Sequence, residues 1–307
     1  MLLLTSLVLP LLLLLGLLGG YLYARSIFDK VERVPVSDVL AGSTTGTNYL
    51  IVGSDTRDAA AIEEAGLDPD AFKEGGGTRS DTMLLLHFGP GGTKMMSIPR
   101  DLYVEIAETG GRQKINAAYN GGPRRLILTV QQSLGIPLDH YVEVDFVSFA
   151  KVVDAVGGVT VDFPNPARDA KTGFEVTTAG PNELDGAQAL AFVRSRAYTE
   201  IIDGRPVTDP TADLGRVQRQ QQFLRSLFSE LGDSRNPLSL ARAAGGAAGG
   251  LRIDDGMGLL DAVRFAWRLR SLDPESLVLP TDPGRNAAGS VLILRDDEAA
   301  PILAQFR

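Results

Sequence analysis

The chain has 307 residues, of which 44% are hydrophobic and 22% are charged, and its formal net charge is -8. This length suffices for one large core or at most two domains, and the ordinary charge content argues against wholesale disorder. The acidic balance excludes a general nucleic-acid binder, and the absence of cysteine excludes disulfides, thiolate nucleophiles and cysteine-based zinc sites. Any anion site must therefore be a local basic cluster.

The N-terminal segment is apolar. Residues 1–24 contain no charge, and at about 1.5 Å per helical residue they are long enough to cross a bilayer core of about 30 Å. Leu22-Tyr23-Ala24 fits a small-x-small cleavage site poorly, so an uncleaved single-pass anchor is preferred to a signal peptide. No Lys or Arg precedes the run, so the positive-inside rule does not orient it, and we expect a basic leader beyond this chain.

Residues 25–47 are interpreted as a linker, and residues 48–307 as one domain. Short apolar runs bounded by Gly or Pro predict strands over residues 48–53, 82–88, 94–98, 141–144, 159–163, 276–279 and 290–294. Apolar residues at helical spacing predict helices over residues 124–134, 146–156, 184–193, 215–231, 236–248 and 257–269. Because strands and helices alternate, the sequence predicts an α/β domain with a mostly buried sheet.

The two histidines are interpreted as structural, because His87 lies in a predicted strand and His140 directly precedes another. Neither lies in a recognisable Ser-His-Asp setting. Aspartates and arginines instead gather where predicted elements begin or end, in residues 53–57, 78–82, 97–101, 194–196 and 213–220. In α/β folds, ligands bind at the carboxyl ends of strands, so we expect the loop of residues 78–82 to fold over that edge.

These arginines suit a phosphorylated ligand. Guanidinium groups bind phosphate oxygens in pairs and stay charged in a pocket. Arg194 and Arg196 flank one residue and would project to one face of an extended stretch. Arg216 and Arg219 are neighbours on one helical face, near a helix N-terminus with its own partial positive charge. The pattern indicates a pyrophosphate-binding site.

Asp55 and Asp81 suit a hard divalent cation, Mg²⁺ or Mn²⁺, that bridges phosphate oxygens. Positioning and charge neutralisation of this kind are the usual basis of phosphoryl transfer. Any single Asp–Arg pair also fits a structural salt bridge, and Asp213 also fits a helix cap. Five such groups in one domain favour a site.

In this order, the motifs resemble the LytR-CpsA-Psr family of cell-wall glycopolymer phosphotransferases. The matching stretches are residues 48–57, 79–82, 97–101, 114–119, 184–196 and 213–220. Together they cover roughly residues 46 to 232, and as an ordered set they are highly specific. The segment between Asp55 and Asp81 is longer than the family pattern.

The resemblance implies a three-layer α/β/α sandwich with a mixed sheet, behind one transmembrane helix at residues 1–24. It implies transfer of a glycan-phosphate of teichoic acid, capsule or arabinogalactan type from a polyprenyl pyrophosphate to peptidoglycan, outside the cytoplasmic membrane. The alternatives are a non-catalytic polyprenyl-phosphate-binding protein and a transcriptional attenuator. The acidic charge and the lack of a helix-turn-helix pattern argue against the attenuator.

The resemblance also assigns residues. Asp55 and Asp81 would hold Mg²⁺ or Mn²⁺ and, with Arg100 and Asp101, form the catalytic set. Asp101 would orient Arg100 or deprotonate the acceptor, and the orienting role is preferred. The pyrophosphate-binding side chains would be Arg57, Arg79, Arg100, Lys114, Arg194, Arg196, Arg216, Arg219 and Gln220.

Overall fold

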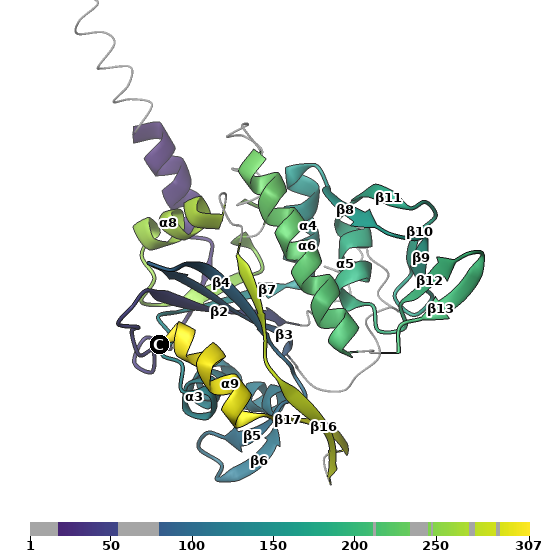
Figure 1. Cartoon of the computed structure of the whole chain (residues 1–307). Coiled ribbons are helices and arrows are strands. Elements are labelled where there is room, and N and C mark those ends of the chain that lie inside the picture. The colour runs from purple at the N-terminus through teal and green to yellow at the C-terminus, as the bar shows by residue number, and fades with distance from the viewer. Residues whose placement is uncertain are drawn as a thin grey trace, which may run out of the picture.

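A seven-stranded mixed sheet forms the centre of the molecule (Figure 1). The computed structural model describes residues 18–54, 80–210, 213–233, 245–246, 248–269, 274–286 and 289–307. The strand order is β1 (Glu32–Val34), β14 (Leu251–Asp254), β7 (His140–Asp145), β2 (Thr47–Ser54), β3 (Ser80–Gly89), β4 (Gly92–Ile98) and β15 (Glu275–Val278). β3 is antiparallel to β2 and β4, whereas β7 is parallel to β2. The predicted mixed sheet is confirmed.

Both faces of this sheet are buried, because successive side chains of a strand point to opposite sides. Leu50 and Val52 of β2 join a core formed with α3 (Gly122–Leu134) and α9 (Asp296–Leu303). Tyr49 and Ile51 face a second core formed with α6 (Asp213–Asp233), α8 (Leu259–Leu269) and helical residues 18–28. Figure 1 shows α3 and α9 on one side of the sheet and α8 on the other.

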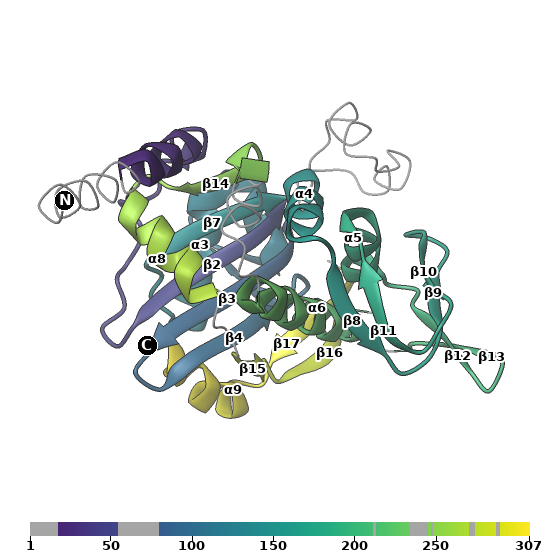
Figure 2. The ribbon, with the colours of Figure 1, turned by 90° about the horizontal axis from the view of Figure 1, so that it is seen from above.

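A second lobe, residues 146–208, has its own core (Figure 2). Its elements are α4 (Phe146–Val156), β8 (Val159–Phe163), β9 (Ala167–Asp169), β10 (Phe174–Val176), β11 (Gly180–Leu184), α5 (Gly186–Arg194), β12 (Thr199–Ile202) and β13 (Arg205–Thr208). α6 serves both lobes. Its Phe223 and Leu227 pack into this core, while Leu224 and Phe228 face the central sheet. The helix therefore lies at the junction.

The remaining described elements named here lie on the α3 and α9 side of the central sheet (Figure 1). They are β5 (Tyr103–Ile106), β6 (Gly111–Lys114), η2 (Ile115–Gly121), β16 (Thr281–Asn286), β17 (Gly289–Leu294) and η3 (Ala304–Phe306). α4 and β8 have the predicted bounds, and other predicted elements that the structure describes shift by a few residues. Most of the helix predicted over residues 236–248 lies outside the described residues.

The region interpreted as a linker carries structure of its own. β1 pairs with β14 at the edge of the central sheet, and Val34 and Val36 are buried in the core. Among the residues that the structure describes, no helix combines the length and apolarity needed to cross a membrane. Residues 1–17, most of the predicted anchor, lie outside them.

Candidate active site at the sheet edge

The predicted motifs meet at one end of the central sheet, here called the site edge, where β2 and β4 end and β3 begins. Gly53 pairs with Thr82, and Ile98 pairs with Met83. The described part of the predicted loop, residues 80–82, thus lies at the same end of the sheet at which β2 and β4 finish. Asp55, Arg57 and Arg79 themselves lie outside the described residues.

An irregularity in strand pairing marks the position of Asp81. Thr82 pairs with Gly53, but the next pair joins Ser80 to Ser54, so Asp81 is an extra residue in β3. Such bulges bend a strand and often occur beside active sites. The backbone thus places residue 81 next to the end of β2, where residue 55 follows. The Asp81 side chain is not among those described.

After β4, a carboxylate lies between two cations. Asp101 Oδ1 is 2.7 Å from Lys114 Nζ, and Asp101 Oδ2 is 3.5 Å from Arg100 Nε. The Asn116 amide donates to the Arg100 carbonyl at 3.2 Å, which fixes the turn against η2. All three charged side chains are largely buried yet reach the surface. This contact favours the orienting role of Asp101.

The turn that carries Arg194 and Arg196 is held by a buried carboxylate. Asp169 Oδ2 accepts hydrogen bonds from the Ser195 hydroxyl at 2.6 Å and from the Arg196 and Ala197 amides at 3.0 and 2.8 Å. Burial alone would raise the pKa of Asp169, but these bonds and one from the Lys171 amide hold that pKa below its usual value. Asp169 is therefore ionised and fixes the backbone between the two arginines.

The arginines on this turn differ in environment. The Arg194 guanidinium lies over the Phe146 ring, with its carbon 5.1 Å from the ring centre. Arg194 is half-buried and Arg196 is exposed. Phe146 opens α4 directly after β7, the parallel neighbour of β2. Arg194 is thus brought towards the carboxyl ends of the sheet strands from the second lobe.

α6 presents its first turns to the same junction. Arg216 and Arg219 are buried, and Arg219 donates to Asp209 at 2.8 Å and to the Ser195 carbonyl at 2.9 Å. The Arg219 guanidinium also lies over the ring of Tyr198, 4.5 Å from its centre. In the described structure Arg219 therefore braces the arginine turn.

Gln220 joins three elements at the site edge. Its amide nitrogen donates to the Thr82 hydroxyl of β3 at 3.0 Å and to the Val193 carbonyl of α5 at 3.1 Å. The next residue, Gln221, lies 3.4 Å from the Ser97 hydroxyl near the end of β4. α6 therefore ties β3, which carries Asp81, and the end of β4, which precedes Arg100, to the helix that ends at Arg194.

The arrangement can bind a multiply charged anion. Four separated segments of this acidic chain carry six basic residues near this end of the sheet: Arg100, Lys114, Arg194, Arg196, Arg216 and Arg219. In the described part of the chain, no group of three His, Cys, Asp or Glu side chains could hold a metal ion. This statement does not cover the two predicted metal ligands, Asp55 and Asp81, because their side chains are not among those described.

Several residues at this junction carry no signal in the sequence. Asp169 and Asp209 lie in no recognisable motif, and they reach their partners only through the fold of the second lobe. A surface hollow of about 470 Å³ is lined by Thr47, Phe88 and Arg268 among others. It lies at the start of β2 and the end of β3, the opposite end of the sheet from the site. We therefore locate the candidate active site from the positions of the basic and acidic residues and not from this hollow.

The fold is that of an α/β protein with a mixed central sheet, and basic residues lie near one end of that sheet. The family model LytR_cpsA_psr matches residues 22–284, so the chain belongs to the LytR_cpsA_psr family. The predicted family is confirmed.

Two curated relatives are similar over most of this chain. A probable cell wall biosynthesis protein LcpB of Corynebacterium glutamicum is 35% identical over 257 residues, which cover 81% of this chain and 58% of that protein. The polyisoprenyl-teichoic acid–peptidoglycan teichoic acid transferase TagU of Bacillus cereus is 32% identical, over 70% of this chain and 67% of its own. The chain thus spans less than two thirds of the corynebacterial relative.

A solved structure shows the same fold. The LytR-Csp2A-Psr enzyme from Actinomyces oris superimposes with a TM-score of 0.72 at 28% identity. The superposition covers 90% of this chain and 95% of that one. The central mixed sheet with helices on both faces is thus the fold of this family.

Proposed function

We propose that this protein is a membrane-anchored, extracytoplasmic phosphotransferase that moves a glycan-phosphate from a polyprenyl pyrophosphate to peptidoglycan. The observation that carries the proposal is that Gln220 and Arg219 tie the arginine-bearing turn after α5 and the first turns of α6 to the start of β3 at the site edge. A pyrophosphate offers several anionic oxygens, which guanidinium groups bind in pairs. The name of the Bacillus cereus relative, a teichoic acid transferase to peptidoglycan, supports the same reaction class.

The arginines and Lys114 act by position and charge. Arg100, Arg194 and Arg196 hold the pyrophosphate oxygens, with Arg57, Arg79, Arg216, Arg219 and Gln220 completing the proposed set. A hydroxyl of the muramic acid in the acceptor forms the new P–O bond. The bond from the glycan-side phosphorus to the bridging oxygen breaks, polyprenyl phosphate leaves, and the proton of the attacking hydroxyl passes to solvent. The basic side chains neutralise the negative charge that grows on the bridging oxygen.

Asp55 and Asp81 fit a hard cation, because the bulge in β3 places residue 81 beside Ser54, the residue that precedes Asp55 in the sequence, and carboxylate oxygens are the preferred ligands of such a cation. Bound Mg²⁺ would add positive charge to the phosphate oxygens. Asp101 orients Lys114 and Arg100, because it contacts both side chains.

The test uses the full chain, reconstituted in vesicles with a short-glycan polyprenyl pyrophosphate, a peptidoglycan acceptor and Mg²⁺. Mass spectrometry follows the glycan-phosphate joined to the acceptor. We expect product from the unaltered chain, a loss of orders of magnitude in Arg194→Ala and Asp81→Ala, and little change in Arg205→Ala. Arg205 is the matched control, because it is an exposed arginine of the second lobe away from the site edge.

The outcomes separate the alternatives. Tight binding of the lipid with no transfer to any acceptor would identify a non-catalytic lipid-binding protein. Release of free glycan-phosphate with no acceptor product would indicate hydrolysis. Absence of lipid binding would contradict both readings. Teichoic acid, capsule and arabinogalactan donors compared side by side would identify the glycan.

A further inference from the structure

α8 has two apolar sides. Its inner side packs on the central sheet through Leu259, Ala262, Phe265 and Leu269. Its outer side carries Leu260, Val263 and Trp267, which are 67%, 47% and 69% exposed. Positions separated by three and four residues lie on one face of a helix, so these three side chains form a continuous outer stripe. Large apolar patches on a soluble surface usually mark an interaction site.

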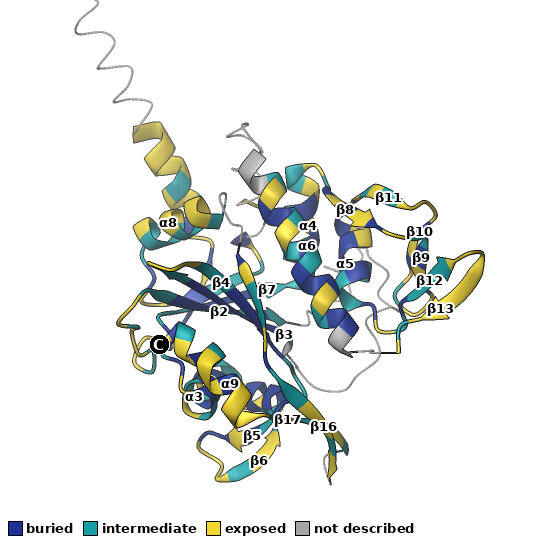
Figure 3. Ribbon diagram, viewed as in Figure 1, coloured by how far each residue is buried: buried dark blue, intermediate teal, exposed yellow. Residues whose placement is uncertain are grey.

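A second helix with exposed apolar residues lies beside α8. Figures 1 and 2 both show helical residues 18–28 next to α8. Phe28 of that helix shares a core with the inner side of α8. Leu18, Tyr21, Leu22 and Tyr23 are each about half exposed, and Figure 3 shows the N-terminal helix mostly in the colour of exposed residues and α8 in the colours of exposed and intermediate residues. The apolar residues 1–17 precede Leu18 in sequence.

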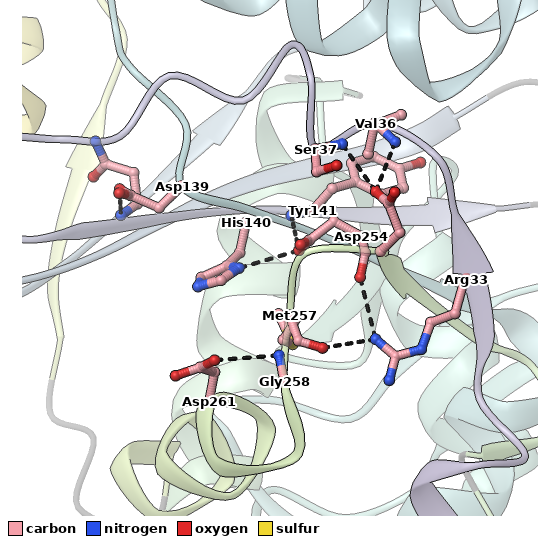
Figure 4. Close-up of polar contacts among 12 residues, drawn as sticks. Arg33, Val36, Ser37, Asp139, His140, Tyr141, Asp254, Met257, Gly258 and Asp261 are labelled. Atoms are coloured by element: carbon pink, nitrogen blue, oxygen red, sulfur yellow. Dashed lines mark hydrogen bonds and ion pairs between the residues drawn. The ribbon is translucent and has the colours of Figure 1, made fainter.

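Hydrogen bonds fasten α8 to the segment that follows this N-terminal helix (Figure 4). Arg33 Nη1 donates to the Met257 carbonyl at 2.7 Å and to the Asp254 carbonyl at 3.3 Å. The Gly258 amide, just before α8, donates to Asp261 in its first turn at 3.2 Å. The stripe is therefore held at a fixed place relative to the point where the apolar N-terminal segment enters the fold.

The charges beside the stripe select the kind of partner. Arg264 and Arg268 are exposed on the same helix. Arg264 pairs with Asp261 three residues before it at 3.1 Å, and the guanidinium carbon of Arg268 lies 5.2 Å from the centre of the Phe88 ring. A helix with aliphatic residues and Trp on one side and Arg beside them is typical of helices that lie in the headgroup region of a bilayer. Guanidinium groups there are attracted to anionic lipids.

We propose that the outer face of α8 docks on an anionic lipid surface, beside the N-terminal segment. Leu260, Val263 and Trp267 enter the headgroup boundary, and Arg264 contacts lipid phosphates. Docking fixes the tilt of the central sheet relative to the bilayer and so the distance of the site edge from it. The inference rests on the proposed function only for the presence of the membrane anchor.

Trp267 is the single tryptophan of the chain, so its fluorescence reports on this face alone. The full chain is reconstituted into vesicles of phosphatidylcholine and phosphatidylglycerol, with bromine-labelled lipids as quenchers and acrylamide as the aqueous quencher. Flotation of the vesicles measures anchoring separately. We expect strong quenching by brominated lipid and a several-fold lower accessibility to acrylamide than in the urea-unfolded chain. Omission of phosphatidylglycerol should weaken both effects.

Two variants sharpen the test. Leu260→Ser with Val263→Ser should restore access of acrylamide to Trp267, with an unchanged unfolding midpoint because both side chains are exposed. Val207→Ser, at an equally exposed apolar position on β13, should change nothing. Trp267→Phe with Val207→Trp moves the reporter to that position, where brominated lipid should not quench it.

Three results would overturn the proposal. Trp267 freely accessible to acrylamide in a chain that floats with the vesicles would contradict docking and leave the anchor and the transferase activity untouched. If Trp267 becomes less accessible to acrylamide as the protein-to-lipid ratio rises, but brominated lipid does not quench it, a second copy of the chain covers α8. A chain that does not float would contradict both docking and the proposed anchor.

Discussion

At the scale of single residues, Asp169 shows that the site depends on a carboxylate outside every motif. It is buried and holds Ser195, Arg196 and Ala197 through three hydrogen bonds. In Asp169→Asn, the amide nitrogen meets backbone donors, so we expect a loss of about 1–3 kcal/mol in unfolding free energy. We also expect a higher KM for the lipid donor, because the turn between Arg194 and Arg196 loosens.

Denaturant unfolding and transfer assays at varied donor concentration measure the two effects of Asp169→Asn. Asp203→Asn is the matched control. Asp203 is exposed on the same lobe in a left-handed backbone conformation that asparagine also tolerates, with φ of 50°. Equal KM values in Asp169→Asn and the unaltered chain would show that the turn does not position the arginines.

Asp101 allows its two proposed roles to be separated. It contacts Lys114 at 2.7 Å and Arg100 at 3.5 Å, so a neutral isostere keeps much of its shape and loses its charge. If Asp101 orients these cations, Asp101→Asn should lower kcat/KM by about ten- to a hundredfold and leave the acidic limb of the pH profile in place. Loss of that limb, with near-complete loss of kcat, would instead identify Asp101 as the general base.

At the scale of elements, the sequence predicts those whose apolar pattern is strong. α4, β8 and the central strands β2, β3 and β4 follow from hydrophobic runs and spacing. The strands β9 to β13 of the second lobe are short and carry many polar residues, so they have no such pattern. α9 contains Pro301, which argues against a helix in sequence terms.

The candidate site divides in the same way. Arg and Asp residues at strand ends and helix starts were visible in the sequence, because the chemistry of phosphate binding selects their types. The residues that hold these side chains in place cannot be identified from the sequence. Asp209 contacts Arg219 and Thr82 contacts Gln220 only after two lobes pack on α6, and no spacing along the chain encodes those contacts. Tertiary packing, and not local pattern, completes the site.

α6 is the element on which both lobes depend. Phe223 is fully buried in the core of the second lobe, with its ring centre 5.4 Å from that of Phe149. Phe223→Ala should lower the unfolding free energy by about 3–5 kcal/mol, because it leaves a cavity beside the helix. Chemical denaturation measures this loss. Ser229→Ala, at an exposed position of the same helix, should stay within about 0.5 kcal/mol of the unaltered chain, and a similar small effect for Phe223→Ala would contradict the packing described.

At the scale of the whole molecule, His87 makes stability depend on pH. It is buried in β3 and contacts Asn48 Oδ1 at 2.7 Å. Burial first, and the nearby Lys94 second, lower the pKa of His87 below the value of 6.5 that it has when unfolded. The unfolded chain therefore takes up the proton more readily. The contribution of His87 to the unfolding free energy is complete above the unfolded pKa of 6.5 and decreases as the pH falls below 6.5.

The expected slope from this one group is at most about 1.4 kcal/mol per pH unit. Unfolding free energies measured from about pH 7 to about pH 5 should fall less steeply in His87→Gln than in the unaltered chain, even though the variant starts from a lower stability. Parallel curves for the two proteins would show that other groups carry the pH dependence.

The segment before the central domain is part of the whole fold and not only a tether. Phe28, Val31 and Val34 are buried, and β1 completes one edge of the central sheet beside β14. A fragment of residues 25–307 keeps these contacts, whereas a fragment of residues 35–307 loses three buried side chains and exposes the edge of β14. At about 1.5–3 kcal/mol for each side chain, the shorter fragment should be less stable by several kcal/mol.

Thermal and denaturant unfolding of the two fragments side by side test this. The shorter fragment should unfold at a clearly lower temperature, and its free edge should favour association with other chains. Replacing Glu32, whose side chain is exposed and pairs with Arg252 at 3.0 Å, by alanine in the longer fragment is the matched control. Because an exposed ion pair contributes about 0–1 kcal/mol, that change should have little effect. Equal stability of the two fragments would show that β1 adds nothing to the sheet it completes.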